Sequence, residues 1–127
     1  MKAPYLALAA ALVMAAPPAW AHPALVASTP AAGATVSGVR QIELRFSEPL
    51  VAKLSSASLV ATKMDMGEGM MDHRMGMGGT VRFDPADAKV MRLVFKGPLP
   101  AGVYHLDWKA VSTDTHHLKG GFDFTVR

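Results

Sequence analysis

Along several short stretches of the chain, apolar and polar side chains alternate, which is typical of β-strands with one buried face. Three stretches alternate most regularly, and their apolar members are Ile42, Leu44 and Phe46; Tyr104, Leu106, Trp108 and Ala110; and Phe122, Phe124 and Val126. Residues 58–60, 80–83 and 90–95 also suit strands. After residue 22, no window of a dozen residues shows the periodicity of a helix.

Residues that favour turns separate these stretches. They occur at 30–33, 84–85, 97–102 and 119–121, where Pro, Gly and Asp interrupt the regular pattern. About seven short strands at this spacing predict an all-β fold, either an antiparallel sandwich or a barrel. The chain has no internal repeat and no linker, so we expect one domain.

The first 21 residues have the pattern of a secretory signal peptide. Lys2 provides a positive start, an apolar run covers 5–16, and residues 19–21 form an A-x-A cleavage signal. The apolar run is short for a membrane span, which disfavours the alternative of an uncleaved anchor. We therefore expect a mature, exported domain of residues 22–127, which is long enough for one packed core.

Composition narrows the function further. Once Lys2 is removed, the domain has 12 Lys plus Arg and 10 Asp plus Glu residues. Because no Lys/Arg cluster accompanies this mild positive charge, we expect no binding to nucleic acid. The chain has no cysteine, so a soft metal would find thioether sulfur here rather than thiolate.

The segment 63–79 holds six of the nine methionines of the chain. Five glycines and five charged residues are interspersed, and the methionine spacing fits neither the period of a strand nor that of a helix. Methionine usually fills gaps in a core, but this composition predicts a solvated, methionine-rich loop. Exposed thioethers in such a loop suggest a role as metal ligands.

Thioethers are soft, neutral donors that select Cu(I) over harder divalent ions. We therefore predict a Cu(I) or Ag(I) site in this loop, in which a subset of three or four side chains binds one ion. The candidates are Met64, Met66, Met70, Met71, Met75 and Met77, with His73 as an additional nitrogen donor. The competing interpretation is an adaptable apolar contact surface.

Cleavage after Ala21 would make His22 the first residue. Its free amine and its imidazole would then form a chelate that suits the tetragonal N and O coordination of Cu(II). Both donors must be deprotonated, so binding should weaken below neutral pH. An N-terminal histidine can also be an accident of cleavage, so this feature does not establish a site by itself.

Further candidate ligands lie between the last two regular strands. In an extended segment Asp114 and His116 would point the same way and could complete a Cu(II) site, whereas His117 would face away. Taken singly, Asp114 is more readily explained as a turn-capping carboxylate and His116 as a surface histidine, so the case for a site rests on their combination. Glu48 is a candidate weak ligand, or an acceptor that orients a ligand. We expect His105 to be an ordinary surface histidine without a metal role.

In combination, these features resemble the CopC family of periplasmic copper-binding proteins. The resemblance covers nearly all of the mature domain, and its specific parts are the leading histidine and the block 107–116. Further matching segments are 23–26, 28–30, 42–48, the methionine-rich segment and 98–104.

The resemblance implies a Greek-key β-barrel or sandwich of immunoglobulin-like (cupredoxin-like) type. It implies a Cu(II) site formed by His22, Asp114 and His116, with the acid corresponding to Glu48 in or beside it. It also implies a Cu(I) site in the methionine-rich loop of some members. The implied role is to carry or sequester copper in the periplasm, in copper resistance and homeostasis, often beside a membrane copper transporter of the CopD type.

The chain departs from the family pattern at two places. His117 stands where a proline is common, and Ala61 stands where an early methionine is expected. Met71 and His73 nevertheless keep the Met-x-His element. We therefore predict a Cu(I) site without a fixed list of ligands.

Two other functions remain alternatives. Lytic polysaccharide monooxygenases also hold copper with an N-terminal histidine on a β-sandwich, and fold alone does not fix function. Trp108 and Tyr104 are the only Trp and Tyr of the mature domain, and we expect both to be buried, which leaves no aromatic platform for a polysaccharide. A metal-free immunoglobulin-like interaction domain would leave the methionines unexplained. We therefore expect a copper carrier and not an enzyme.

Overall fold

Strands account for nearly all the regular structure in the computed structural model, which describes residues 24–65 and 70–127. The side chains of Asp65 and of residues 70–74 are not described. The strands are β1 (Leu25–Thr29), β2 (Thr35–Val36), β3 (Gln41–Phe46), β4 (Ser56–Asp65), β5 (Met70–Gly76), β6 (Thr80–Asp84), β7 (Asp87–Val94), β8 (Gly102–Val111) and β9 (His117–Val126), with a 3-10 turn, η1 (Ala52–Leu54), before β4. The part of the chain described here includes no helix with the length and apolar character of a membrane span.

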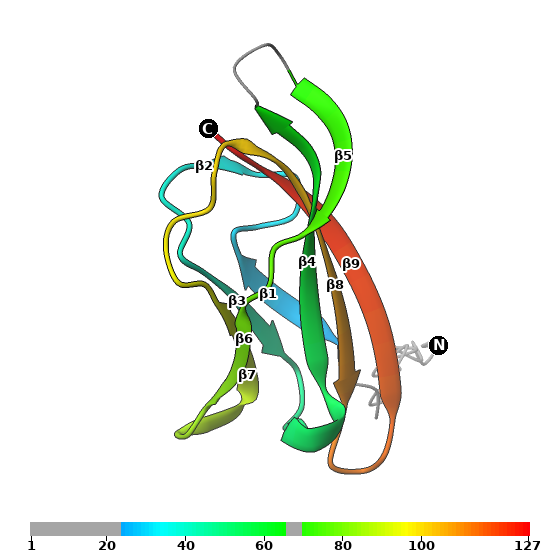
Figure 1. Cartoon of the computed structure of the whole chain (residues 1–127). Helices are drawn as coiled ribbons and strands as arrows, with labels where there is room; N and C mark the ends of the chain where they lie inside the picture. The colour runs from blue at the N-terminus through cyan, green and yellow to red at the C-terminus, as the bar shows by residue number, and fades with distance from the viewer. Residues whose placement is uncertain (1–23, 66–69) are drawn as a thin grey trace, which may run out of the picture.

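The strands form two sheets that pack face to face (Figure 1). One sheet has the order β1-β3-β7-β6 and the other β2-β9-β8-β4-β5, and only the short β2–β9 pair is parallel. In the described residues no strand of one sheet pairs with a strand of the other. The fold is therefore a sandwich, as one of the two predicted alternatives, and the closed barrel is wrong.

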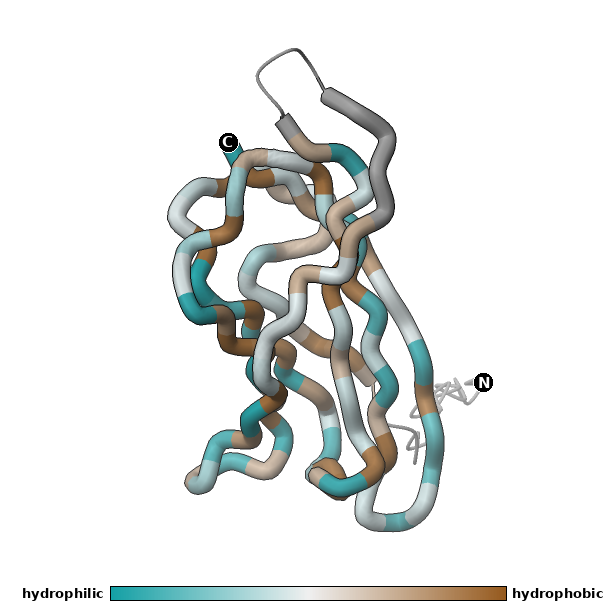
Figure 2. Tube along the Cα trace, in the orientation of Figure 1, coloured by the Kyte–Doolittle hydropathy of each residue, from teal (hydrophilic) through white to brown (hydrophobic). Residues whose placement is uncertain are grey.

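The core lies between the sheets and includes most of the residues that alternation predicts. Ile42, Leu44 and Phe46 are at most 1 % exposed, and Tyr104 is fully buried. The rings of Phe46 and Trp108 meet edge to face, with centroids 5.1 Å apart. Figure 2 shows hydrophobic positions recurring along the paired strands. Each large side chain buried in this way contributes about 1.5–3 kcal/mol, so this interface holds the sheets together.

The described residues form nine strands where about seven were predicted. Six of the nine correspond to predicted segments with residue ranges; β1, β2 and β5 do not, and β4 is longer than its predicted segment. β2 has only two residues, and β1 contains an irregularity in its pairing with β3. Neither strand shows regular alternation, because neither has a fully buried face and every residue of both is at least partly exposed.

The predicted loop over 63–79 is wrong for most of its length. β4 continues to Asp65 and β5 starts at Met70, so the two strands form a hairpin that extends beyond the rest of the sandwich (Figure 1). Residues 66–69 lie outside the described residues. The glycine-rich composition predicted a loop, but the two segments pair with each other and so satisfy their backbone hydrogen bonds as a hairpin. Strand formation depends strongly on such context.

The expectation that these methionines avoid the core is also wrong in part. Met64 and Met77 are partly buried and pack against the core. The Met77 N–H donates to the Leu59 carbonyl oxygen at 2.9 Å. The hairpin is joined to the sandwich by the pairing of β4 with β8, and these two methionines add packing, which is the usual role of this adaptable side chain.

The predicted turn at 119–121 is wrong as well, because these residues lie inside β9. A Cβ atom at Gly120 would lie 2.4 Å from Cζ2 of Trp108, and one at Gly121 would lie 2.7 Å from the Leu106 carbonyl oxygen. Glycine in a strand interior often marks such a close approach. The two glycines are therefore explained by cross-strand packing.

Candidate metal site

The short segment that follows β3 connects the first described residue to the β8–β9 connection. The Ala24 N–H donates to the Ser47 hydroxyl at 2.9 Å, and the Ser47 N–H donates to the Ala24 carbonyl oxygen at 2.8 Å. Two residues further on, the Pro49 carbonyl oxygen accepts from the Thr113 N–H at 3.2 Å. These bonds bring three distant parts of the sequence to one end of the sandwich.

The β8–β9 connection is a tight turn. The Ser112 N–H donates to the His116 carbonyl oxygen at 3.0 Å, and the Thr115 N–H donates to the Ser112 carbonyl oxygen at 2.9 Å. Thr115 has a φ of 70°, which is rare for a β-branched residue. Such backbone strain is often found at functional sites, and here it reverses the chain between Asp114 and His116.

This turn brings the side chains of Asp114 and His116 together. His116 Nδ1 lies 3.1 Å from Asp114 Oδ2, and the Ser112 hydroxyl donates to Asp114 Oδ1. The predicted proximity is present, but a turn and not an extended segment produces it. The Ser112 hydroxyl, followed by His116, lowers the pKa of Asp114 below its usual range, so the carboxylate is ionised and accessible to a cation.

Glu48 lies between Ser47 and Pro49, the two residues that hold the neighbouring segments. It is partly exposed and forms no ion pair with any residue in 24–65 or 70–127. His22 lies outside the described residues. Among those that are described, no three His, Asp or Glu side chains converge on a metal position, so Asp114 and His116 form a pair of candidate ligands.

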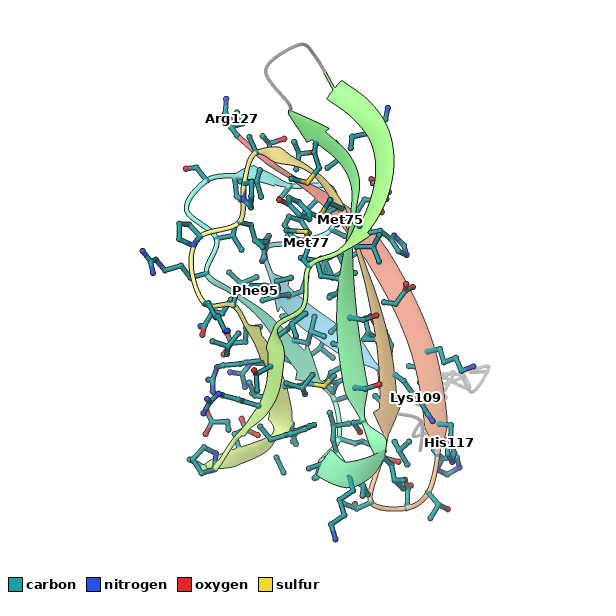
Figure 3. The ribbon with its side chains drawn as sticks, viewed as in Figure 1. Met75, Met77, Phe95, Lys109, His117 and Arg127 are labelled. Carbon is teal, nitrogen blue, oxygen red and sulfur yellow. The ribbon has the colours of Figure 1, made fainter. Side chains whose placement is uncertain are left out.

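The methionine candidates differ in their surroundings. Met75 is 42 % exposed, whereas Met64 and Met77 pack against the core. Figure 3 shows Met75 and Met77 where β5 rejoins the body of the sandwich. In the backbone register Met64 lies opposite Met71. Met66 lies outside the described residues, as do the side chains of Met70, Met71 and His73.

His105 has surroundings that the sequence interpretation did not foresee. Its Nδ1 lies 2.5 Å from Asp123 Oδ1, and its Nε2 lies 3.0 Å from Asp107 Oδ1. Asp123 first, then Asp107, raise the pKa of His105, against the effect of burial. Alternation along β8 places Asp107 on the same face, but Asp123 becomes its neighbour only through the β8–β9 register.

Comparison with known proteins agrees with this fold. The profile of the CopC domain family matches residues 25–127. Copper resistance protein C of Escherichia coli is 44 % identical over 110 residues, which cover 86 % of this chain and 84 % of that protein. Copper resistance protein C of Pseudomonas syringae pv. tomato is 42 % identical over 123 residues, covering 97 % and 94 %.

A solved structure supports the same relationship. PcoC, a methionine-rich copper resistance protein from Escherichia coli, superposes with a TM-score of 0.73 at 41 % identity. The match covers 84 % of this chain and all of that one. Since the family profile and these relatives span almost all of the described residues, the chain belongs to the CopC domain family.

Proposed function

We propose that this protein binds copper and carries or sequesters it in copper resistance. The proposal assigns Cu(II) to His22, Asp114 and His116, with Glu48 as a weak ligand or as an acceptor that orients one. It assigns Cu(I) to a subset of the methionines around the β4–β5 hairpin. Copper is the cargo of this protein rather than a catalytic cofactor.

The observation that carries the proposal is the network of bonds around residues 47–50. Ala24 is held against Ser47, and Thr113 is held against Pro49. His22 is two residues before Ala24, and two residues span at most about 7 Å. This short tether supports a position of the N-terminal histidine near the end of the sandwich that carries the Asp114 turn.

The donor geometry also suits a transition metal. Asp114 Oδ2 and His116 Nδ1 lie 3.1 Å apart in direct contact, and two donors that bind one ion at about 2 Å each lie at a similar spacing of about 3 Å, so an ion could replace this contact with little movement of either side chain. A carboxylate, an imidazole and the amine and imidazole of His22 would give the N and O donors that Cu(II) favours. Glu48 lies in the connecting segment and has a carboxylate available to orient such a ligand.

The methionines support a separate Cu(I) site. Thioethers select Cu(I), and Met75 presents the most exposed sulfur side chain among those described. Met77 and Met64 also contact the core, so ligation by either requires its side chain to leave that packing. We therefore expect Met75 to contribute more to Cu(I) affinity than Met77 does.

The proposed role places the protein in the periplasm after removal of residues 1–21, with a membrane copper transporter of the CopD type as a partner. No catalytic step is assigned to it. Trp108 and Tyr104 are buried as expected, so neither forms the exposed aromatic platform that a polysaccharide-oxidising enzyme would use.

Titration with Cu(II) tests the proposed site. The chain that begins at His22 is compared with the same chain preceded by one glycine, using Trp108 fluorescence and the EPR spectrum. We expect tight binding by the first and at least a tenfold loss for the second, because the glycine removes the amine–imidazole chelate. Asp114→Asn should cause a comparable loss, and His117→Gln serves as the matched control.

Equal affinity of the two N-terminal forms would refute the His22 chelate. For Cu(I), Met75→Leu should weaken binding, while Met91→Leu, a substitution in the buried part of β7, should not. Failure of both the Cu(II) and the Cu(I) titrations at micromolar concentration would favour a metal-free interaction domain.

A further inference from the structure

A groove of about 400 Å³ crosses β4, β8 and β9 near the end that carries the Asp114 turn. Its lining includes Ser56, Ser58, Asp107, Lys109 and Lys119. These five side chains are exposed, and those on β8 alternate with the buried Leu106, Trp108 and Ala110. The groove therefore belongs to the outer face of the five-stranded sheet.

Two lysines lie side by side in this groove, on adjacent strands. Lys109 and Lys119 are register partners on β8 and β9, and like charges directly opposite each other destabilise a sheet. Neither lysine forms an ion pair within the described ranges 24–65 and 70–127. Nothing in the fold requires this repulsion, so the two ammonium groups are available to an anionic partner.

The acid that lines the groove does not neutralise these lysines. Asp107 Oδ1 lies 3.0 Å from Nε2 of His105, which Asp123 also holds at 2.5 Å. The lining therefore carries two ammonium groups and one carboxylate, and that carboxylate is already held by His105. The groove is therefore electropositive, and the hydroxyl groups of Ser56 and Ser58 add hydrogen-bond donors along its β4 side.

The groove lies beside the proposed copper-binding turn. β8 leads from Lys109 into the turn that carries Asp114, and β9 begins at His117, two residues before Lys119. Figure 3 shows Lys109 and His117 close to this end of the β8–β9 hairpin. Leu54, which is 52 % exposed, precedes Ser55, whose hydroxyl accepts from the Val111 N–H at 3.0 Å. An exposed apolar side chain thus borders the same end of the sheet.

We propose that this groove docks an acidic, extended segment of a protein partner, whose carboxylates pair with Lys109 and Lys119. An extended segment presents side chains to one face about every 7 Å, and the long, flexible side chains of two lysines on strands about 5 Å apart can reach carboxylates at that repeat. Charge complementarity of this kind increases association rate and specificity. Docking would bring the partner next to the Asp114 turn. A role of this docking in copper transfer rests on the proposed function.

NMR titration of the copper-free, ¹⁵N-labelled chain from residue 22 tests this proposal with an acetylated, amidated hexaglutamate peptide. We expect saturable shifts at the amides of Ser56, Ser58, Lys109, Lys119 and Gly120, with a midpoint that rises with salt. The double variant Lys109→Glu/Lys119→Glu should weaken binding at least tenfold, and Lys109→Gln/Lys119→Gln should weaken it less. The matched control is Lys89→Glu/Lys96→Glu, which makes the same charge change outside the groove.

Several outcomes would overturn the proposal. They are the absence of saturable shifts, shifts spread evenly over all lysines, and equal weakening by the control variant. Equal affinity for inorganic phosphate would indicate a small-anion site instead, and lysine-dependent binding to phosphatidylglycerol vesicles without binding to the peptide would indicate a membrane surface. Because the titration uses copper-free protein, its result is independent of the copper titrations that test the proposed function.

Discussion

Replacing Gly120 by alanine is a direct test of why glycine occupies the middle of β9. The new Cβ atom would lie 2.4 Å from Cζ2 and 2.7 Å from Cε2 of Trp108. Carbon atoms in contact are normally about 3.5–4.0 Å apart, so the indole would have to move by about 1 Å. It is 7 % exposed and meets Phe46 edge to face at 5.1 Å, which leaves little room for that movement.

The expected loss of stability follows from two opposing effects. Overpacking of a well-packed core typically costs about 1–3 kcal/mol. Removing a glycine from a strand interior returns about 0.5–1 kcal/mol, because the unfolded chain loses conformational freedom. We therefore expect Gly120→Ala to lower the free energy of unfolding by about 1–2 kcal/mol, which corresponds to a fall in Tm of about 5–10 °C for a domain of this size.

Urea unfolding followed by Trp108 fluorescence measures this change and also reports the displaced indole as a shifted emission spectrum of the native state. Gly97→Ala is the matched control, since nothing lies within 4 Å of a Cβ atom there. If Gly120→Ala were as stable as the wild type with unchanged emission, the packing explanation for this glycine would be wrong.

The remaining predictions concern titration. In His105→Gln the charge-assisted bonds to Asp107 and Asp123 are lost, and for such partly exposed pairs we expect a destabilisation of about 0.5–1 kcal/mol. Because the pKa of His105 is raised in the folded state, this difference from the wild type is fully present below the unfolded pKa of about 6.5. The difference in stability disappears as the pH rises through the folded pKa of His105. Urea unfolding of both proteins at several pH values measures this difference. A difference that grows with pH would contradict the proposed role of His105. In Ser112→Ala the hydroxyl that chiefly lowers the pKa of Asp114 is removed, so we expect Cu(II) to be released at a higher pH than from the wild type, as followed by EPR. An unchanged release midpoint would show that protonation of Asp114 does not control release.

Period-two alternation identified the strands that build the core. The prediction was correct for β3, for β8 and for the second half of β9. Each of these buries one face against the opposite sheet, so apolar and polar residues alternate in its own sequence. The hairpin of β4 and β5 was predicted as a loop because its stabilisation comes from pairing between two segments and not from the propensity of either.

Glycine misled the sequence interpretation at 120–121 for a similar reason. A Gly-Gly pair is a turn signal when it is considered alone. In the folded protein the same pair allows Trp108 and the β8 backbone to approach β9 closely. The deciding contacts come from residues more than ten positions away, which no local pattern can reveal.

The sequence by itself determined the residue types available for chemistry: thioethers without cysteine, an Asp-x-His element, and a histidine that cleavage would place at the N-terminus. The softness and the charge of a ligand atom are properties of its own residue type, so they can be read from the sequence without knowledge of the fold. Tertiary structure alone decided that the Asp114 turn and Ala24 share one end of the sandwich through residues 47–50. It also decided that Asp123 lies against His105, and that Lys109 lies beside Lys119. These neighbours are fixed by strand register and sheet packing, in which residues far apart along the chain meet because their hydrogen bonds and apolar faces must be satisfied together.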